Sequence, residues 1–347
     1  MILTGLVRVF AWRAGFVARP ARDRFAERAV PLGGGIAIFI TLTAFIVPAT
    51  IVIKFFPDNL NSLAQTANIE IADFLAKVNQ LVVILLSAFV LLVLGLWDDK
   101  KGLGPYFKLA VQFAAAITAV IFADVRVEFF IENKIITSVL SAVWIVLIIN
   151  AFNFLDNMDG LTAGIAVIAS SILFTAAAIS GQVFVGGLAL VLIGTLSGFL
   201  VLNFPPAKIF MGDAGSLVVG FFVALLTLRT NYYHTGESGR YLVLMPALVM
   251  AVPLYDFISV TLLRISQGKS PFVGDTQHFS HRLKRHGLTD TQTVLTLYLA
   301  TLCTGLGATF LYQVNLAGAI LIFTQTFMIL AIIAVFETTA GNDKNST

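Results

Sequence analysis

Long apolar runs divide nearly the whole chain, and they restrict it to folds that lie in a lipid bilayer. A helix needs roughly 17 to 25 apolar residues to cross a hydrocarbon layer of about 30 Å. We identify eleven such runs, of which the first is weak and the fourth is short, so ten spans is the alternative. The runs cover residues 2–17, 32–53, 81–97, 109–123, 135–152, 164–180, 183–202, 217–228, 241–263, 291–312 and 317–336.

The composition is that of a membrane protein. Hydrophobic residues make up 58% of the 347 residues and charged residues 12%, and the mean hydropathy of +0.92 is far above that of soluble domains. We therefore predict an all-α polytopic membrane protein with one integral membrane domain over residues 1–347, ending in a disordered polar tail over 337–347. The net charge of only +3 argues against a nucleic-acid partner.

The polar loops between these runs share one side of the membrane when the spans alternate. The loops over 98–108, 153–163, 203–216 and 264–290 then lie with the basic segment 19–31, and this set carries thirteen Lys and Arg residues against six on the other side. Because cytoplasmic loops carry the excess of positive charge, we assign this side to the cytoplasm. A cytoplasmic site assembled from five loops follows.

The third of these loops, NFLDNMDG, is the strongest candidate for a metal site. Asn153, Asp156, Asn157 and Asp159 offer only oxygen and amide groups, with no Cys or His nearby. Such ligands suit magnesium, which takes one or two protein ligands and leaves the other positions to water and phosphate. The spacing of three places Asn153, Asp156 and Asp159 on one face if the segment is helical, whereas helix capping by Asp159 or Asn157 is the alternative.

The second loop, DDKKGLGPYFK, places two acids at the end of a span. Adjacent like charges repel, so Asp98 and Asp99 need a cation, supplied by the neighbouring Lys100 and Lys101 or by a metal. A solvated turn is the alternative. Lys108 opens the next helix, where it would either reach the interface or bind phosphate.

The fourth loop, MGDAGS, brings Asp213 to the start of a predicted helix. A helix N-terminus behind a Gly-rich turn offers free amides to an anion, and an aspartate there can hold a metal that bridges to that anion. A capping aspartate is the alternative.

Two basic loops complete the set. The first carries four arginines, including Arg24, that either anchor the helix at the lipid surface or face a phosphate, and glycines 33–35 would let the backbone approach a ligand or another helix. The fifth carries His278, His281 and Arg282, which could clamp a diphosphate. A zinc site is less favoured there, and a solvated basic patch is the alternative.

Taken together, five segments in order resemble the polyprenyl-phosphate N-acetylhexosamine-1-phosphate transferases, and within them the N-acetylglucosamine (GlcNAc) branch. The resemblance covers about residues 15–283 and rests on RAVPLGGG, GLWDDKKGLGPYFK, NFLDNMDGL, FPPAKIFMGDAGS and SPFVGDTQHFSHRL. It implies transfer of a sugar 1-phosphate from a UDP-N-acetylhexosamine to undecaprenyl phosphate with release of UMP, dependent on Mg2+ or Mn2+. Such a step opens the synthesis of a cell-envelope glycan at the bacterial inner membrane, and a homodimer stays open.

The resemblance also implies roles for individual residues. Those expected at the reaction centre are Asp98 and Asp99 near the lipid phosphate, Lys108 on phosphate, Asp156, and His278 and His281 near the diphosphate and sugar. Asp159 matches the position that reads uracil, Arg282 belongs to the histidine loop, and Asn153 and Asp213 match the metal ligands. Arg24 and Asn157 are also expected on substrate, although the family pattern carries other residues at their positions.

Three positions depart from the family pattern. Arg24 and Ala26 stand where the first loop usually carries Lys-x-His, Ser280 replaces the middle histidine of His-x-His-His, and Asn157 with Met158 replaces Gly-Leu. Two other functions are the alternatives. A phospho-MurNAc-pentapeptide transferase would carry three consecutive histidines, and a secondary transporter would place its acids near the bilayer midplane.

Overall fold

The computed structural model describes residues 1–18, 29–56, 75, 77–127, 131–230, 240–270, 278–285 and 287–339. Helices make up most of these ranges, which confirms the predicted all-α class. Two strands of two residues, Val17–Ala18 (β1) and Val30–Pro31 (β2), pair antiparallel. The helices are α1 (Ile2–Arg13), α2 (Gly34–Phe55), α5 (Val78–Lys101), α6 (Pro105–Phe122), α7 (Lys134–Leu155), α8 (Leu161–Ile179), α9 (Val183–Asn203), α10 (Gly212–Arg229), η1 (Arg240–Leu244), α11 (Met245–Val249), α12 (Ala251–Ser266), α13 (Phe279–Arg285), α14 (Asp290–Phe310), η2 (Leu311–Gln313) and α15 (Leu316–Thr339).

Nine helices in the described part of the chain are long and apolar enough to cross a bilayer, and one bent pair would form a tenth span. The weak first run forms α1, whose 12 residues reach only about 18 Å. That length is too short to cross the bilayer. Of the two expected numbers of spans, eleven and ten, the structure therefore supports ten. Of the predicted tail, residues 340–347 lie outside the described residues, and α15 ends at Thr339.

The tenth span is broken between α11 and α12, which meet at 70°. Pro253 has no backbone N–H with which to bond the carbonyl of Val249, where α11 ends. The missing hydrogen bond of Pro253 explains the break. The bend changes the direction of α12, which contacts α13.

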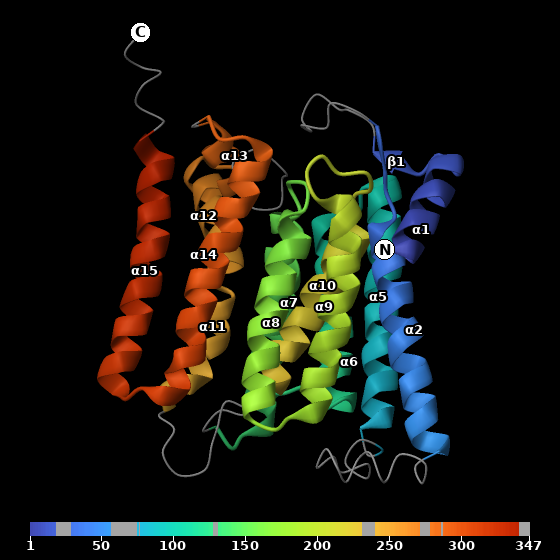
Figure 1. Cartoon of the computed structure of the whole chain (residues 1–347), viewed down its shortest axis with the longest axis horizontal. Coiled ribbons are helices and arrows are strands. Elements are labelled where there is room, and N and C mark those ends of the chain that lie inside the picture. Colours follow the sequence, from blue (N-terminus) through green and yellow to red (C-terminus); the bar gives the residue numbers. More distant parts are fainter. Residues whose placement is uncertain are drawn as a thin grey trace.

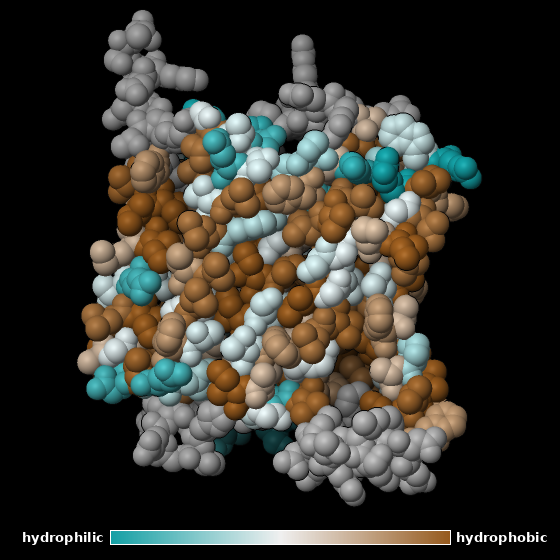
Figure 2. Space-filling model, in the orientation of Figure 1, coloured by the Kyte–Doolittle hydropathy of each residue, from teal (hydrophilic) through white to brown (hydrophobic). Residues whose placement is uncertain are grey.

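The loops that carry the candidate residues lie at one end of the helix bundle. In Figure 1 the turns that follow α5, α7 and α9 gather at the upper end, where α13 also lies. Hydrophobic residues cover the middle of the face in Figure 2, and hydrophilic residues gather toward its upper and lower ends. This is the pattern of a bundle that exposes apolar side chains to lipid and polar loops to water.

Helix α10 is the centre of the bundle, and its first turn carries Asp213. It packs against α2, α5, α7, α8 and α9, and 78% of its residues are buried. A helix that is apolar all round belongs in a core. The position of its N-terminus is therefore fixed by these five helices, which flank the first four loops of the site.

Glycines let two neighbouring helices touch the start of α10. A Cβ added to Gly95 of α5 would lie 2.3 Å from Ala214 Cα, and one on Gly35 of α2 would lie 2.4 Å from the Gly215 nitrogen. The backbone of α2 also donates from Gly35 N–H to the Met211 carbonyl at 3.1 Å. The predicted close approach at glycines 33–35 is thus made to another part of the protein, and it holds the loop that precedes Asp213.

Candidate active site

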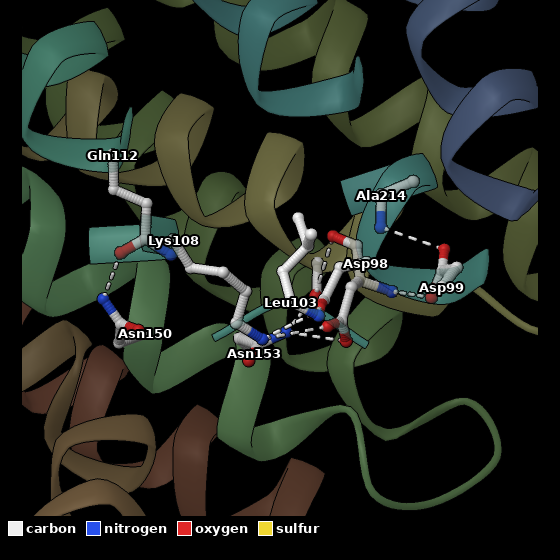
Figure 3. Close-up of polar contacts among 10 residues, drawn as sticks. Asp98, Asp99, Leu103, Lys108, Gln112, Asn150, Asn153 and Ala214 are labelled. Carbon is white, nitrogen blue, oxygen red and sulfur yellow. Dashed lines mark hydrogen bonds and ion pairs between the residues drawn. The ribbon is translucent and has the colours of Figure 1, made fainter. Parts of the chain in front are cut away.

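Lys108 is the cation at the centre of the site. From the first turn of α6 its Nζ donates to Asp98 Oδ2 at 2.5 Å and to Asp213 Oδ2 at 3.3 Å, as part of the cluster drawn in Figure 3. Asp98, in the last turn of α5, also accepts the Leu103 N–H through Oδ1 at 2.5 Å. The cation bound to Asp98 is thus Lys108, whereas Lys100 and Lys101, one of the two cation sources expected, are exposed.

Asp99 points away from Asp98 and caps helix α10. Its Oδ1 accepts the Asp213 N–H at 2.9 Å, and its Oδ2 accepts the Ala214 N–H at 3.3 Å (Figure 3). The first N–H groups of a helix have no partner within it and carry partial positive charge, so a carboxylate is well placed there. Gly212 has a φ of +70°, and a Cβ on it would lie 2.7 Å from Asp99 Oδ2. Glycine is therefore needed for this contact.

Asn153 connects α7 to Asp213. Its Nδ2 donates to Asp213 Oδ1 at 3.0 Å and to Ser216 Oγ at 2.9 Å. Asp213 thus receives Lys108 on one oxygen and Asn153 on the other, and it makes no capping bond of its own to α10. The capping alternative for Asp213 is not what the structure has, since Asp99 supplies the cap from another helix.

The third loop follows directly on α7, which ends at Leu155. Asn153 is helical, but Asp156 and Asp159 lie in the turn beyond, so the three do not share one helix face. Burial raises the pKa of Asp156 to about 8, and the nearby carboxylates of Asp213, Asp99 and Asp159 add to the shift. A site that holds this many acids around one lysine attracts a cation.

Asp159 and Asn157 do not cap α8, whose N-cap is Gly160 with no side-chain bond. Asp159 Oδ2 instead accepts the Ala207 N–H at 2.8 Å, and Asn157 Nδ2 donates to the Phe154 carbonyl at 2.8 Å. The third loop is therefore held to the fourth by Asp159.

The fifth loop meets the third through α13. Ser280 donates from Oγ to Asn157 Oδ1, so two of the departures from the family pattern are partners of each other. Arg282 donates to Ser259 Oγ of α12 at 2.9 Å. His278 lies just before α13, with its ring edge-on to Phe154 at 5.7 Å. The side chain of His281 and the whole of Arg24 lie outside the described residues.

Four polar residues escaped the sequence reasoning. Asn203 is buried, accepts the Gly160 N–H at 3.1 Å and donates to the Ile209 carbonyl at 2.9 Å. One turn deeper than Lys108 and Asn153, Asn150 donates to Gln112 at 2.7 Å and ties α7 to α6 (Figure 3). The fourth is Asp256 of α12, buried beside His278. A polar residue inside an apolar run is the signal that would have found Gln112, Asn150 and Asp256.

The donor atoms around Asp213 fit a magnesium ion. Over the described ranges, no three His, Cys, Asp or Glu side chains form a metal-binding group. Magnesium needs only one or two protein ligands, however, and the oxygens of Asp213 and Asn153 are of the hard kind that it takes. The Asn153 amide nitrogen donates to Asp213 and Ser216, so its oxygen faces away from Asp213. Turning this amide over would bring its oxygen toward an ion bound by Asp213. Asp156 of the third loop is a further carboxylate that could bind the ion.

Comparison with known proteins points to one family. The model of "Glycosyl transferase family 4" matches residues 81–231. The Bacillus subtilis (strain 168) protein named "Probable undecaprenyl-phosphate N-acetylglucosaminyl 1-phosphate transferase" is 31% identical, over 86% of this chain and 78% of that protein.

Two further relatives agree. The "Decaprenyl-phosphate N-acetylglucosaminephosphotransferase" of Mycobacterium tuberculosis (strain ATCC 25618 / H37Rv) is 30% identical over 85% of this chain and 76% of its own length. The "Undecaprenyl-phosphate alpha-N-acetylglucosaminyl 1-phosphate transferase" of Thermotoga maritima is 30% identical, with 82% and 78% covered. Because similarity at this level extends over most of the length of each protein, the chain belongs to the polyprenyl-phosphate GlcNAc-1-phosphate transferase family.

Proposed function

We propose that this chain transfers GlcNAc 1-phosphate from UDP-GlcNAc to a polyprenyl phosphate, with undecaprenyl phosphate as the expected acceptor, and releases UMP. The observation that carries the proposal is the contact of Lys108 and Asn153 with Asp213 at the loop end of a membrane bundle. The names of the similar proteins support the sugar and the lipid class. They do not favour the pentapeptide transferase.

The chemistry joins two anions, so their approach must be screened. Lys108 supplies a fixed positive charge, and Asp98 holds its ammonium group beside Asp213. A Mg2+ or Mn2+ ion on Asp213 and Asn153 would screen the diphosphate and stabilise the charge of the departing UMP. Preorganised charges of this kind stabilise a phosphoryl-transfer transition state without rearranging during the reaction.

The transfer itself needs no base from the protein. An oxygen of the lipid phosphate attacks the β-phosphorus of the donor, the bond from that phosphorus to the bridging oxygen breaks, and UMP leaves with the electron pair. The second proton of a phosphate dissociates near pH 6, so at neutral pH the attacking oxygen is already ionised. Both oxygens of Asp98 and both of Asp99 accept hydrogen bonds, which supports organising roles for them.

We place the site on the cytoplasmic face of a bacterial inner membrane. The support is the excess of Lys and Arg on the loops that share the site's side, thirteen against six. A UDP-sugar donor, which is made in the cytoplasm, agrees with this side.

The test is transfer of radiolabelled GlcNAc 1-phosphate from UDP-GlcNAc to undecaprenyl phosphate by the purified protein, with Mg2+ and with a chelator. We expect a metal-dependent lipid product that Asp213→Asn fails to make. The matched control is Asp124→Asn, an aspartate paired with Arg126 outside the site, which should keep wild-type rates. Product in the presence of the chelator would refute the metal requirement. No product from UDP-GlcNAc would refute GlcNAc as the transferred sugar.

A further inference from the structure

Asp256 is a buried acid that no motif of the site includes. It lies in α12 and is 1% exposed. An acid inside a membrane segment is costly and is retained where it has a partner and a use. Its partners in the structure lie on the histidine loop.

Asp256 binds the start of α13 with both oxygens. Its Oδ1 accepts the Phe279 N–H at 2.8 Å, and its Oδ2 lies 3.0 Å from His278 Nδ1. An ionised carboxylate can only accept, so against ionised Asp256 the Nδ1 of His278 is the nitrogen that carries the proton and donates. The partner of one ring nitrogen sets the tautomer and the orientation of the whole ring, and here it turns Nε2 away from α12.

The ring fixed in this way lies beside the third loop. His278 stands edge-on to Phe154 with ring centroids 5.7 Å apart and planes at 84°. Phe154 follows Asn153 in the chain, and the Arg264 guanidinium lies over its ring at 5.0 Å. Asp256 thus sets how an imidazole is presented beside Phe154, the chain neighbour of Asn153.

We propose that Asp256 is a positioning residue for His278: it holds Nδ1–H toward α12 so that His278 meets the phosphates of the substrates through Nε2. The inference rests on the proposed function, since it assigns a second residue to the same reaction. It differs from a purely structural role, in which Asp256 would only anchor α13 through the Phe279 N–H.

The direct test is the tautomer of His278 in the full-length protein in lipid nanodiscs. The chain has four histidines, so 15N-histidine spectra of the wild type minus those of His278→Gln give the signal of His278. We expect protonated Nδ1 in the wild type and in Asp256→Glu, which keeps a carboxylate. In Asp256→Asn the Nδ1 proton should be lost, because the amide nitrogen can donate to that position.

The kinetic test uses the same variants. Loss of the partner that orients a metal-bound histidine typically costs about 10- to 100-fold in activity, and we expect the same range for a histidine that meets phosphate. We expect kcat of Asp256→Asn to fall by about this factor with little change in KM, and Asp256→Glu to recover part of it. Gln places its amide nitrogen near Nε2 and Asn places it near Nδ1, so His278→Gln should retain more activity than His278→Asn.

A double mutant separates action through His278 from a structural effect. If Asp256 acts through the ring, Asp256→Asn combined with His278→Gln is no slower than His278→Gln alone. Tyr255→Leu is the matched control, because Tyr255 packs on the Phe279 ring at 5.7 Å, whereas His278 Nδ1 contacts Asp256. It should keep the wild-type tautomer and a kcat within about twofold.

Three results would overturn the inference. These are an unchanged tautomer in Asp256→Asn, losses that multiply in the double mutant, and better activity in His278→Asn than in His278→Gln. If Asp256→Asn does not fold, Asp256→Glu decides: loss of the Nδ1 proton there contradicts the proposal. If the wild type transfers nothing from any UDP-sugar, the proposed function fails, while the spectra still decide the role of Asp256.

Discussion

Asp99 caps the helix that carries Asp213: a carboxylate at the end of α5 accepts the Asp213 N–H at 2.9 Å. Successive residues of a helix point about 100° apart, so Asp98 can bind Lys108 while Asp99 binds the start of α10. The two acids that follow one another in the sequence thus avoid each other by dividing their partners. One holds the cation of the site, and the other fixes the backbone of the proposed metal ligand.

This cap predicts that Asp99 affects stability as well as activity. Removing a capping side chain costs about 0.5–2 kcal/mol, so Asp99→Ala should lower the free energy of unfolding by about that amount. It should also slow transfer at least tenfold, because Asp213 loses its anchor. Thermal unfolding in detergent and the transfer assay measure the two effects. Asp124→Asn, a change of an acid outside the site, should alter neither, and a stable but inactive Asp99→Ala would show that the cap is not structural.

A second prediction separates the charge of Lys108 from its structural role. Lys108→Met leaves Asp98 and Asp213 without their shared cation, so both stability and transfer should fall. Adding Asp98→Asn removes one of the two carboxylates and should restore part of the melting temperature. Transfer should stay at the level of Lys108→Met, because the positive charge is still absent. Recovery of activity in the double variant would contradict a direct role of Lys108 on phosphate.

A third prediction concerns the glycine contacts of α10. Gly95→Ala would place a Cβ 2.3 Å from Ala214 Cα, so α5 must move away and carry Asp98 and Asp99 with it. We expect a loss of about 1–3 kcal/mol in the free energy of unfolding, together with a loss of transfer. Gly187→Ala is the matched control, since no atom lies within 4 Å of its added Cβ and alanine favours helix by about 0.5–1 kcal/mol. A tolerated Gly95→Ala would refute close helix contact as the reason for this glycine.

The sequence predicts the spans and the residue types of the site because both follow from local chemistry. Long apolar runs must form membrane helices, and acids at their ends need cations, so the loops of Asp98, Asn153 and Asp213 could be found without coordinates. Residues 2–17 are the one predicted span that is too short to cross the bilayer. This run has a mixed composition and forms a helix of 12 residues.

The pairing within the site could not be predicted, because it depends on contacts across long stretches of chain. Lys108 was ambiguous alone, and its bond to Asp213 spans 105 positions. Asp213 looked like a cap for its own helix, whereas Asp99 supplies that cap from 114 positions away. Asp256 has no motif around it, and only the packing of α12 on α13 shows its use.

The last prediction concerns Asp156 and pH. Burial raises the pKa of its carboxyl from 3.8 to about 8, so the neutral form is favoured in the folded, metal-free protein. A carboxyl whose pKa is higher in the folded than in the unfolded state stabilises the fold only while it is protonated. This contribution to the free energy of unfolding is lost as the pH rises. The melting temperature of the metal-free protein should therefore fall from about pH 4 to pH 8 and level off above. Asp156→Asn, which cannot ionise, should make this fall shallower, and the other carboxylates of the site account for the part that remains.

Magnesium should reverse the trend, because a metal binds the ionised carboxylate and releases its proton. The rise in melting temperature caused by Mg2+ should accordingly grow between pH 6 and pH 9 in the wild type, and grow less in Asp156→Asn. Thermal unfolding at fixed Mg2+ across this range, with Asp124→Asn as the control, measures the difference. A Mg2+ effect with the same pH dependence in both proteins would place the metal away from Asp156 and leave Asp213 and Asn153 as its protein ligands.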